Sequence, residues 1–302
     1  MPGQHAKISV VVPCLGQAAQ LENCLEALAT QDIFSPFELL VVDSGHDPEV
    51  EQAVRNFDIA RLVRGDKGLD AACARNTGAA FARGRYLVFT DADCVPEPDF
   101  LRMAERTLDS GIRILTGPVL DADKRWIPAC DNLLQFVDCS PKRPAGPAQL
   151  APGCSLAISM QDFNEIGGFR KGRAEDVQFS LTAAEQLPGA LMYCPEMIIR
   201  HQGRSTWSAF LNHHKQFGFD RGLYGHLITP TQRRLGRLRL MVLPVALKRF
   251  SYIARSIVKW KRWRLSTVIF LSPLLISGLI AWSVGFRRGL NAATQSNDPT
   301  DV

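Results

Sequence analysis

Residues 86–96 read YLVFTDADCVP, an apolar run that ends in two aspartates. The run Tyr86 to Phe89 is large, apolar and typical of a short buried strand. Asp91 and Asp93 follow it, and ligands of open α/β sheets bind at the carboxyl ends of strands. Paired carboxylates there suit Mg²⁺ or Mn²⁺, which share their coordination shell with a substrate phosphate. A solvated acidic turn is the alternative for an isolated pair of aspartates.

The sequence before this stretch alternates between two kinds of pattern. Apolar runs typical of parallel strands lie at 7–13, 37–42, 60–63 and 86–89, and helical spacing of apolar residues lies between them at 17–30, 48–57 and 69–82. This alternation predicts an α/β fold with a mostly parallel, Rossmann-like sheet covered by helices. The glycine-rich dinucleotide and P-loop motifs are absent.

Composition narrows the class of protein further. The chain has 302 residues, 46% of them hydrophobic, which suffices for one large domain or two small ones. Its eight cysteines include no C-x-x-C pair, and several lie in apolar runs, so we expect reduced thiols instead of a disulfide framework. The N-terminus has no long apolar core, and we do not expect a signal peptide.

Charge is distributed unevenly along the chain. From Arg221 to Asn297 there are fourteen Lys and Arg and no Asp or Glu, whereas the remainder carries 21 basic and 30 acidic residues. An acidic body is thus joined to a basic, apolar tail. Nucleic acid and an anionic membrane surface are the two partners that such a tail favours.

Three motifs in the first half carry a family resemblance. ISVVVP at 8–13, VVDSG at 41–45 and ARNTGAAFARGRYLVFTDADCVP at 74–96 together resemble the large glycosyltransferase family 2, which uses nucleotide sugars and has the GT-A fold. The match continues with APGCSLAISMQDFNEIGGF at 151–169, AEDVQFSLTAAEQ at 174–186 and RHQGRS at 200–205. It covers roughly residues 7–225.

The resemblance implies a donor nucleotide site. Its expected members are Pro13, Asp43, Arg75 and Asp91. Asp43 would bond the base or ribose, although a turn or N-cap aspartate is the alternative. The guanidinium of Arg75 could reach a carboxylate or the pyrophosphate, and a solvated helix face is its alternative. His46 departs from the family pattern, so the sequence does not indicate which base is bound.

The resemblance also implies metal and catalytic residues. Asp93 would be the direct ligand of Mn²⁺ or Mg²⁺, with Asp91 nearer the ribose and His201 as a third ligand, or else a structural histidine. The ion would offset charge on the departing nucleoside diphosphate. Asp176 would be the general base of an inverting transfer, with Glu175 beside it. The alternative for this acidic pair is stabilisation of a helix N-terminus.

Two segments remain outside these motifs. Residues 125–153, rich in Pro and Gly, are expected to form a long loop that selects the acceptor. Residues 265–286 carry no charge and would span about 33 Å as a helix, enough to cross a bilayer. Before them, one stripe holds Lys248, Arg255, Lys259 and Arg262, and another holds Phe250, Ile253, Ile257 and Trp260, as in an interfacial helix. Helices that pack on the catalytic domain are the alternative.

We therefore predict a GT-A catalytic domain at 1–228, a basic amphipathic region at 229–264, a transmembrane or re-entrant helix at 265–286 and a polar tail at 287–302. The protein would be an inverting, metal-dependent glycosyltransferase of the inner membrane, with its catalytic domain in the cytoplasm. It would move a single sugar to a polysaccharide, lipid-linked or other envelope acceptor, without nucleic acid. The alternatives are a metal-dependent nucleotidyl or phosphoryl transferase and a catalytically silent membrane adaptor.

Overall fold

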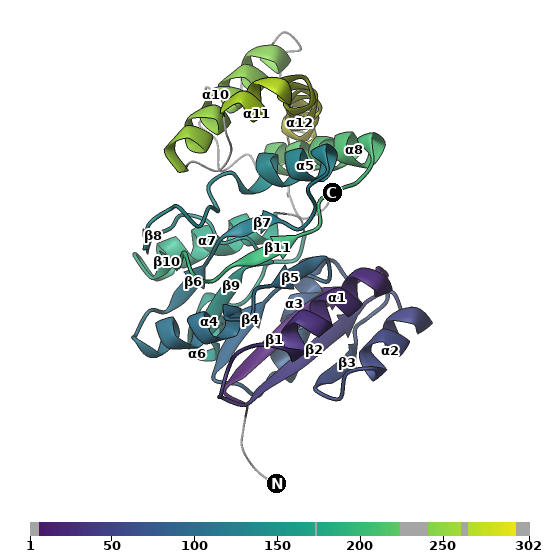
Figure 1. Ribbon diagram of the computed structural model, residues 1–302, viewed down its shortest axis with the longest axis vertical. Helices are drawn as coiled ribbons and strands as arrows, with labels where there is room; N and C mark the ends of the chain where they lie inside the picture. Colours follow the sequence, from purple (N-terminus) through teal and green to yellow (C-terminus); the bar gives the residue numbers. More distant parts are fainter. Residues whose placement is uncertain (1–5, 173, 224–240, 261–264, 294–302) are drawn as a thin grey trace. The chain divides into compact units, whose positions relative to one another are not determined.

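The structure is a computed structural model that describes residues 6–172, 174–223, 241–260 and 265–293. The chain forms two compact units: an α/β unit of residues 1–122 and 143–201, and a helical unit of residues 123–142 and 202–302 (Figure 1). The α/β unit ends at His201, and the expected boundary of the catalytic domain at residue 228 stays a prediction. Segment 123–142 also leaves the α/β unit, which local sequence patterns did not indicate.

The α/β unit is built on an eight-stranded sheet of order β3-β2-β1-β4-β9-β6-β10-β8. Strands β3, β2, β1 and β4 run parallel, and β9 is antiparallel to both β4 and β6. The predicted mostly parallel sheet is thus confirmed. The strands are β1 (Ile8–Cys14), β2 (Phe37–Asp43), β3 (Ala60–Arg64), β4 (Tyr86–Phe89), β6 (Ile114–Thr116), β8 (Gly146–Pro147), β9 (Leu156–Ser159) and β10 (Leu191–Tyr193).

A second sheet of three strands lies at the end of this unit, in the order β5-β11-β7. It comprises β5 (Cys94–Pro96), β7 (Val119–Asp121) and β11 (Ile199–His201). Strand β11 pairs antiparallel with β5, and this register sets His201 opposite Cys94. A residue late in the chain is thereby brought beside the DAD stretch.

Helices cover the large sheet, with α1 and α4 in front of it and α3 behind it in Figure 1. Helix α3 begins after Asp70, whose side chain accepts a hydrogen bond from the Cys73 N–H, as an N-cap does. Gly78 lets α3 approach the sheet, since a Cβ there would lie 2.3 Å from Val11. The helices are α1 (Ala18–Ala29), α2 (Pro48–Arg55), α3 (Ala71–Phe81), α4 (Phe100–Asp109), α6 (Met160–Ile166) and α7 (Glu175–Gln186).

The helical unit consists of α5 (Trp126–Phe136), α8 (Trp207–Leu223), α10 (Val242–Trp260), α11 (Leu265–Phe270) and α12 (Ser272–Ala292). Helices α8 and α12 meet backbone to backbone: a Cβ at Gly218 would lie 1.9 Å from the Trp282 carbonyl oxygen, and one at Gly285 would lie 1.8 Å from that of Lys215. Small residues permit this close approach. Segment 125–153 was predicted to be a long loop, but its first part forms the helix α5.

The predicted apolar helix at 265–286 is not a single element. It is divided at Leu271, and Pro273 lies in the first turn of α12, where a residue without an N–H is tolerated. None of the helices in the described ranges combines the length and the hydropathy that crossing a bilayer requires. Parts of the predicted amphipathic region (229–240 and 261–264) and of the polar tail (294–302) lie outside the described residues.

The stripe of α10 that was expected to face lipid is buried instead. Ile253 and Ile257 are 2% and 1% exposed, and they belong to the apolar core that α10 shares with α5, α11 and α12. Phe250 packs against the same core. Hydrophobic periodicity finds the buried face of a helix, but it does not say whether protein or lipid covers that face.

Candidate active site

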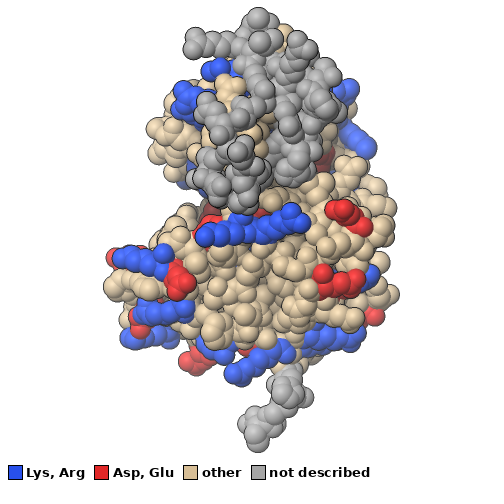
Figure 2. Space-filling view, turned by 180° about the vertical axis from the view of Figure 1, so that it is seen from behind, with Lys and Arg blue, Asp and Glu red and all other residues tan. Residues whose placement is uncertain are grey.

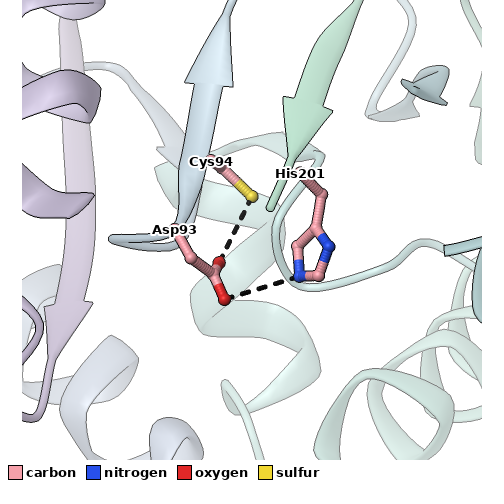
Figure 3. A group of neighbouring side chains, drawn as sticks. All are labelled: Asp93, Cys94 and His201. Carbon is pink, nitrogen blue, oxygen red and sulfur yellow. Dashed lines mark hydrogen bonds and ion pairs between the residues drawn. The ribbon is translucent and has the colours of Figure 1, made fainter. Parts of the chain in front are cut away.

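The site begins at the end of β4, where the predicted metal ligands gather. The Asp93 carboxylate lies 3.5 Å from the Nε2 atom of His201, both side chains being mostly buried. Asp93, Cys94 and His201 each offer one ligand atom, and these atoms lie within 4.8 Å of one another (Figure 3). The predicted pairing of Asp93 with His201 is thus present in the geometry, whereas Asp91 is not part of this group.

This group fits a divalent cation with oxygen and nitrogen ligands. A carboxylate oxygen and an imidazole nitrogen face a common point, as a borderline or hard ion such as Mn²⁺ requires. The Cys94 thiol donates to Asp93 over 3.7 Å, and burial holds the pKa of Cys94 well above its usual range. Thiolates suit softer ions than Mn²⁺ or Mg²⁺, so Asp93 and His201 are the residues that would hold such an ion.

Arg75 reaches carboxylates, which is one of the two contacts expected of its guanidinium, and it does not lie on a solvated helix face. Its side chain is 3% exposed, and its two terminal nitrogens lie 2.5 Å from Asp91 and 2.7 Å from Glu175. Asp91 belongs to the DAD stretch after β4, and Glu175 is the first residue of α7. The buried guanidinium therefore joins two carboxylate groups of the site, in addition to any contact with a donor pyrophosphate.

The surroundings of Arg75 hold it in this position. A Cβ at Gly153 would lie 2.7 Å from the guanidinium carbon, so the loop before β9 closes directly over the side chain. On another side the guanidinium carbon lies 5.5 Å from the centre of the Phe169 ring. Any larger residue at position 153 would have to displace the guanidinium.

Asp176 is the second residue of α7. Burial, and next the negative charge of Glu175, raise the pKa of Asp176 to about 7, although Arg75 lowers it. A carboxylate with such a pKa can accept a proton near neutral pH. The arrangement therefore suits the predicted general base. The charge of Glu175 raises the proton affinity of Asp176, and the charge of Arg75 lowers it.

Asp43 occupies the end of β2 and is fully buried. One carboxylate oxygen accepts hydrogen bonds from the N–H groups of Gly45 and His46, which makes it the turn aspartate of the alternative interpretation. The other oxygen is buried and accepts no hydrogen bond within the described part of the chain, with Arg64 at 3.6 Å. Pro13, at the end of β1, pairs with Val42 next to Asp43.

Two residues that fix the site were not identified from sequence. The Asn76 side chain donates to the Phe169 carbonyl and accepts from the Phe169 N–H. The second oxygen of Asp70 accepts from the Gly172 N–H. Both tie α3 to the segment that leads into α7, and only the helix-capping position of Asp70 was a sequence signal.

Comparison with known proteins concerns the family and the fold. Residues 9–127 match the family described as Glycosyl transferase family 2. The glycosyltransferase AglE of Haloferax volcanii is 26% identical over 60% of this chain and 66% of its own. The hyaluronan synthase of Pasteurella multocida is 29% identical over 43% of this chain but only 14% of its own. The chain therefore spans less than two thirds of the curated relatives' length.

Among solved structures, the mannosyltransferase PcManGT of Pyrobaculum calidifontis, in complex with GDP-Man and Mn²⁺, is 19% identical with a TM-score of 0.59. The superposition covers 94% of this chain and 88% of that one. The α/β unit thus has a GT-A-like fold. The match to the family 2 glycosyltransferases covers the part of this unit from β1 to β7.

Proposed function

We propose that the protein is an inverting, metal-dependent glycosyltransferase that moves a single sugar from a nucleoside diphosphate sugar to an acceptor hydroxyl. The observation that carries the proposal is the chain of contacts from Asp91 through Arg75 to Glu175. These contacts bring Asp91, in the DAD stretch after β4, next to the first turn of α7, which holds Asp176. A donor and a proton acceptor are needed side by side for direct displacement.

The donor would lie at the carboxyl ends of β1, β2 and β4. The Asp43 oxygen that accepts no hydrogen bond in the described chain is the group that would accept one from the base or ribose, and Pro13 would border it. Asp93 and His201 would hold Mn²⁺ or Mg²⁺. When bound, the ion would offset charge on the departing diphosphate. PcManGT, whose fold is similar, was solved with GDP-Man and Mn²⁺.

The chain's own residues would supply the rest of the reaction. The acceptor hydroxyl approaches the anomeric carbon from the side opposite the diphosphate, and Asp176 takes its proton as the new bond forms. Glu175 favours proton uptake by Asp176 through its negative charge, while Arg75 keeps Glu175 in place. Inversion follows from this single displacement, with the oxygen of the acceptor on the face opposite the leaving group.

For the acceptor we propose an envelope polysaccharide, a lipid-linked glycan or a related envelope component. We place the reaction at the cytoplasmic face of the inner membrane. The basic composition from Arg221 to Asn297 and the reduced cysteines support this location. Nucleotide sugars and an acceptor on the membrane would meet there.

The decisive experiment is a screen of nucleotide sugars for hydrolysis that depends on Mn²⁺, with Asp93→Asn as the inactive reference. Release of a nucleoside diphosphate supports sugar transfer, and NMR of the first-formed sugar should show the inverted anomer. Release of pyrophosphate would instead identify a nucleotidyl transferase. The proposal would be contradicted if folded protein hydrolysed none of the nucleotide sugars with either Mn²⁺ or Mg²⁺.

A further inference from the structure

The outer face of α10 is a surface that the described residues leave exposed. Leu243, Leu247 and Val258 are 54%, 51% and 63% exposed, although leucine and valine are among the residues most often buried. The helical repeat sets all three along one side of α10, adjoining the buried side that holds Ile253 and Ile257. The apolar side of the helix is thus wide, and only part of it is buried.

Cations lie next to the exposed apolar side. Lys248, Arg255 and Lys259 are exposed and recur at intervals of seven and four residues, which sets them in a stripe along the helix. None of these three makes an ion pair within the described part of the chain. The Arg255 guanidinium donates to the Ser251 carbonyl, and the Lys259 ammonium lies 4.3 Å from the centre of the Trp260 ring.

Carboxylates that could neutralise this stripe are scarce in the helical unit. The described residues contain four, of which Asp131 and Asp220 are buried and Asp123 is paired with Arg125. Asp138 accepts hydrogen bonds from Tyr252 and Trp260. Figure 2 shows Lys and Arg side chains along the outer margins of this unit. The surface is therefore positive and apolar at once.

A second apolar group belongs to the same unit. Phe270, at the end of α11, is 69% exposed, and its ring centre lies 5.4 Å from that of Trp126, which is 57% exposed. Neighbouring Ile269 is also exposed. Tryptophan is enriched at membrane–water interfaces, where its ring lies at the level of the lipid headgroups.

We propose that the outer face of α10, defined by Leu243, Leu247 and Val258 with Lys248, Arg255 and Lys259, binds the surface of an anionic lipid bilayer with the helix in the plane of the membrane. The apolar side chains enter the headgroup boundary, and the cations bind lipid phosphates beside them. The inference deepens the proposed location but is independent of the donor chemistry. It also requires no helix that crosses the bilayer.

The test uses the full chain and sedimentation with vesicles of phosphatidylcholine, with or without phosphatidylglycerol. The wild-type protein should bind the anionic vesicles and keep part of that binding at high salt, because apolar insertion is not screened. Lys248→Gln, Arg255→Gln and Lys259→Gln together should weaken binding to anionic vesicles by roughly 100-fold, at about fivefold per cation. Leu247→Gln with Val258→Gln should abolish the part that resists salt.

Matched controls come from the α/β unit. Arg83→Gln, Arg85→Gln and Arg106→Gln remove the same charge from exposed positions, and Phe34→Gln removes a fully exposed apolar side chain. These variants should bind vesicles as the wild type does. Donor hydrolysis in every sample reports on folding and on the proposed activity separately from lipid binding.

Three results would overturn the proposal. One is equal vesicle binding by the wild type and both α10 variants. Another is an active wild-type protein that stays in solution with either kind of vesicle. The third is a wild-type dimer, unaffected by lipid, that Leu247→Gln with Val258→Gln makes monomeric, since this face would then bind a second copy of the chain.

Discussion

Arg75 and Glu175 are one hundred positions apart in the chain, and their side chains meet at 2.7 Å. The same guanidinium binds Asp91 at 2.5 Å. Removing one partner of a buried charge pair leaves the others uncompensated, which typically costs about 3–5 kcal/mol. The Arg75 bridge, meaning Arg75 with Asp91 and Glu175, is therefore both a structural and an electrostatic element of the site.

Replacing Arg75 by Met should separate these two roles. The pKa of Asp176 should rise further, because the positive charge of Arg75 lowers it. The acidic limb of the pH profile of kcat/KM should accordingly move to higher pH, and the melting temperature should fall. Arg75→Lys keeps the charge but cannot bind two carboxylates in a planar fork, so it should restore the pH profile more than the rate.

The matched control for this pair is Arg113→Met. Arg113 also binds two carboxylates, those of Asp162 and Glu165, but it is 42% exposed and lies outside the site. It should leave the pH profile unchanged. If Arg75→Met lowers stability with no movement of the pH profile, the bridge only holds the fold together.

Gly153→Ala provides a second way to disturb the bridge without removing a charge. The added methyl would lie 2.7–2.8 Å from three atoms of the Arg75 guanidinium and would push it from its carboxylates. Misplacement of about 1 Å at a reacting centre can lower a rate by about 10²-fold. We expect a loss of kcat of that order, with little change in the KM for the donor.

Gly278→Ala is the corresponding control in the helical unit, where the added methyl would crowd Phe210 and Leu134 at 2.6 and 2.7 Å. Both variants should lose stability, and only Gly153→Ala should lose donor hydrolysis. Equal rates in the two variants would mean that the position of Arg75 is not critical.

Sequence patterns alone predicted much of the α/β unit. The strand Tyr86–Phe89 has the predicted bounds, and the helix predicted at 17–30 differs from Ala18–Ala29 by one residue at each end. These elements are local, and buried parallel strands and amphipathic helices have distinct apolar periods. The segment 125–153 was misread because its Pro and Gly residues lie mainly after Phe136, beyond α5.

Sequence patterns do not predict contacts between residues distant in the chain. The contact of Asp93 with His201, which follows from the pairing of β5 with β11, was expected only from the family resemblance, and the closure of Gly153 over Arg75 was not expected. Neither leaves a periodic signal. The outward side of α10 was missed because its buried apolar stripe gave the stronger pattern.

The metal assignment predicts different effects for three neighbouring residues. Asp93→Ala should abolish Mn²⁺-dependent donor hydrolysis while the protein stays folded, and His201→Ala should raise the Mn²⁺ concentration required by at least about 10–100-fold. Cys94→Ser should change neither, because Mn²⁺ and Mg²⁺ prefer oxygen and nitrogen ligands to sulfur. Titration of metal against hydrolysis, after removal of bound ions by a chelator, measures all three.

A different order of effects would identify a different site. Loss of metal dependence in Cys94→Ser, with tighter binding of Cd²⁺ than of Mn²⁺ by the wild type, would make the thiol a ligand. Full turnover in excess chelator would show that no ion takes part.

Asp176→Asn tests the general base, since it keeps the shape of the side chain and removes the proton acceptor. Sugar transfer should fall by about 10²–10⁴-fold, and affinity for the donor should stay nearly the same because the nucleotide is bound elsewhere. In the wild type, kcat/KM should rise with pH through about 7, where the Asp176 carboxyl loses its proton.

The stability of the protein should change with pH in the opposite sense. The pKa of Asp176 in the folded protein is above its usual value, so its contribution is full in acid and is lost as the pH rises through 7. Asn stays neutral, and Asp176→Asn should therefore melt at a higher temperature than the wild type at pH 8 but at a similar one at pH 4. Thermal unfolding at the two pH values measures this difference. A variant that binds the donor poorly, or that is less stable than the wild type at pH 8, would make Asp176 a structural or donor-binding residue.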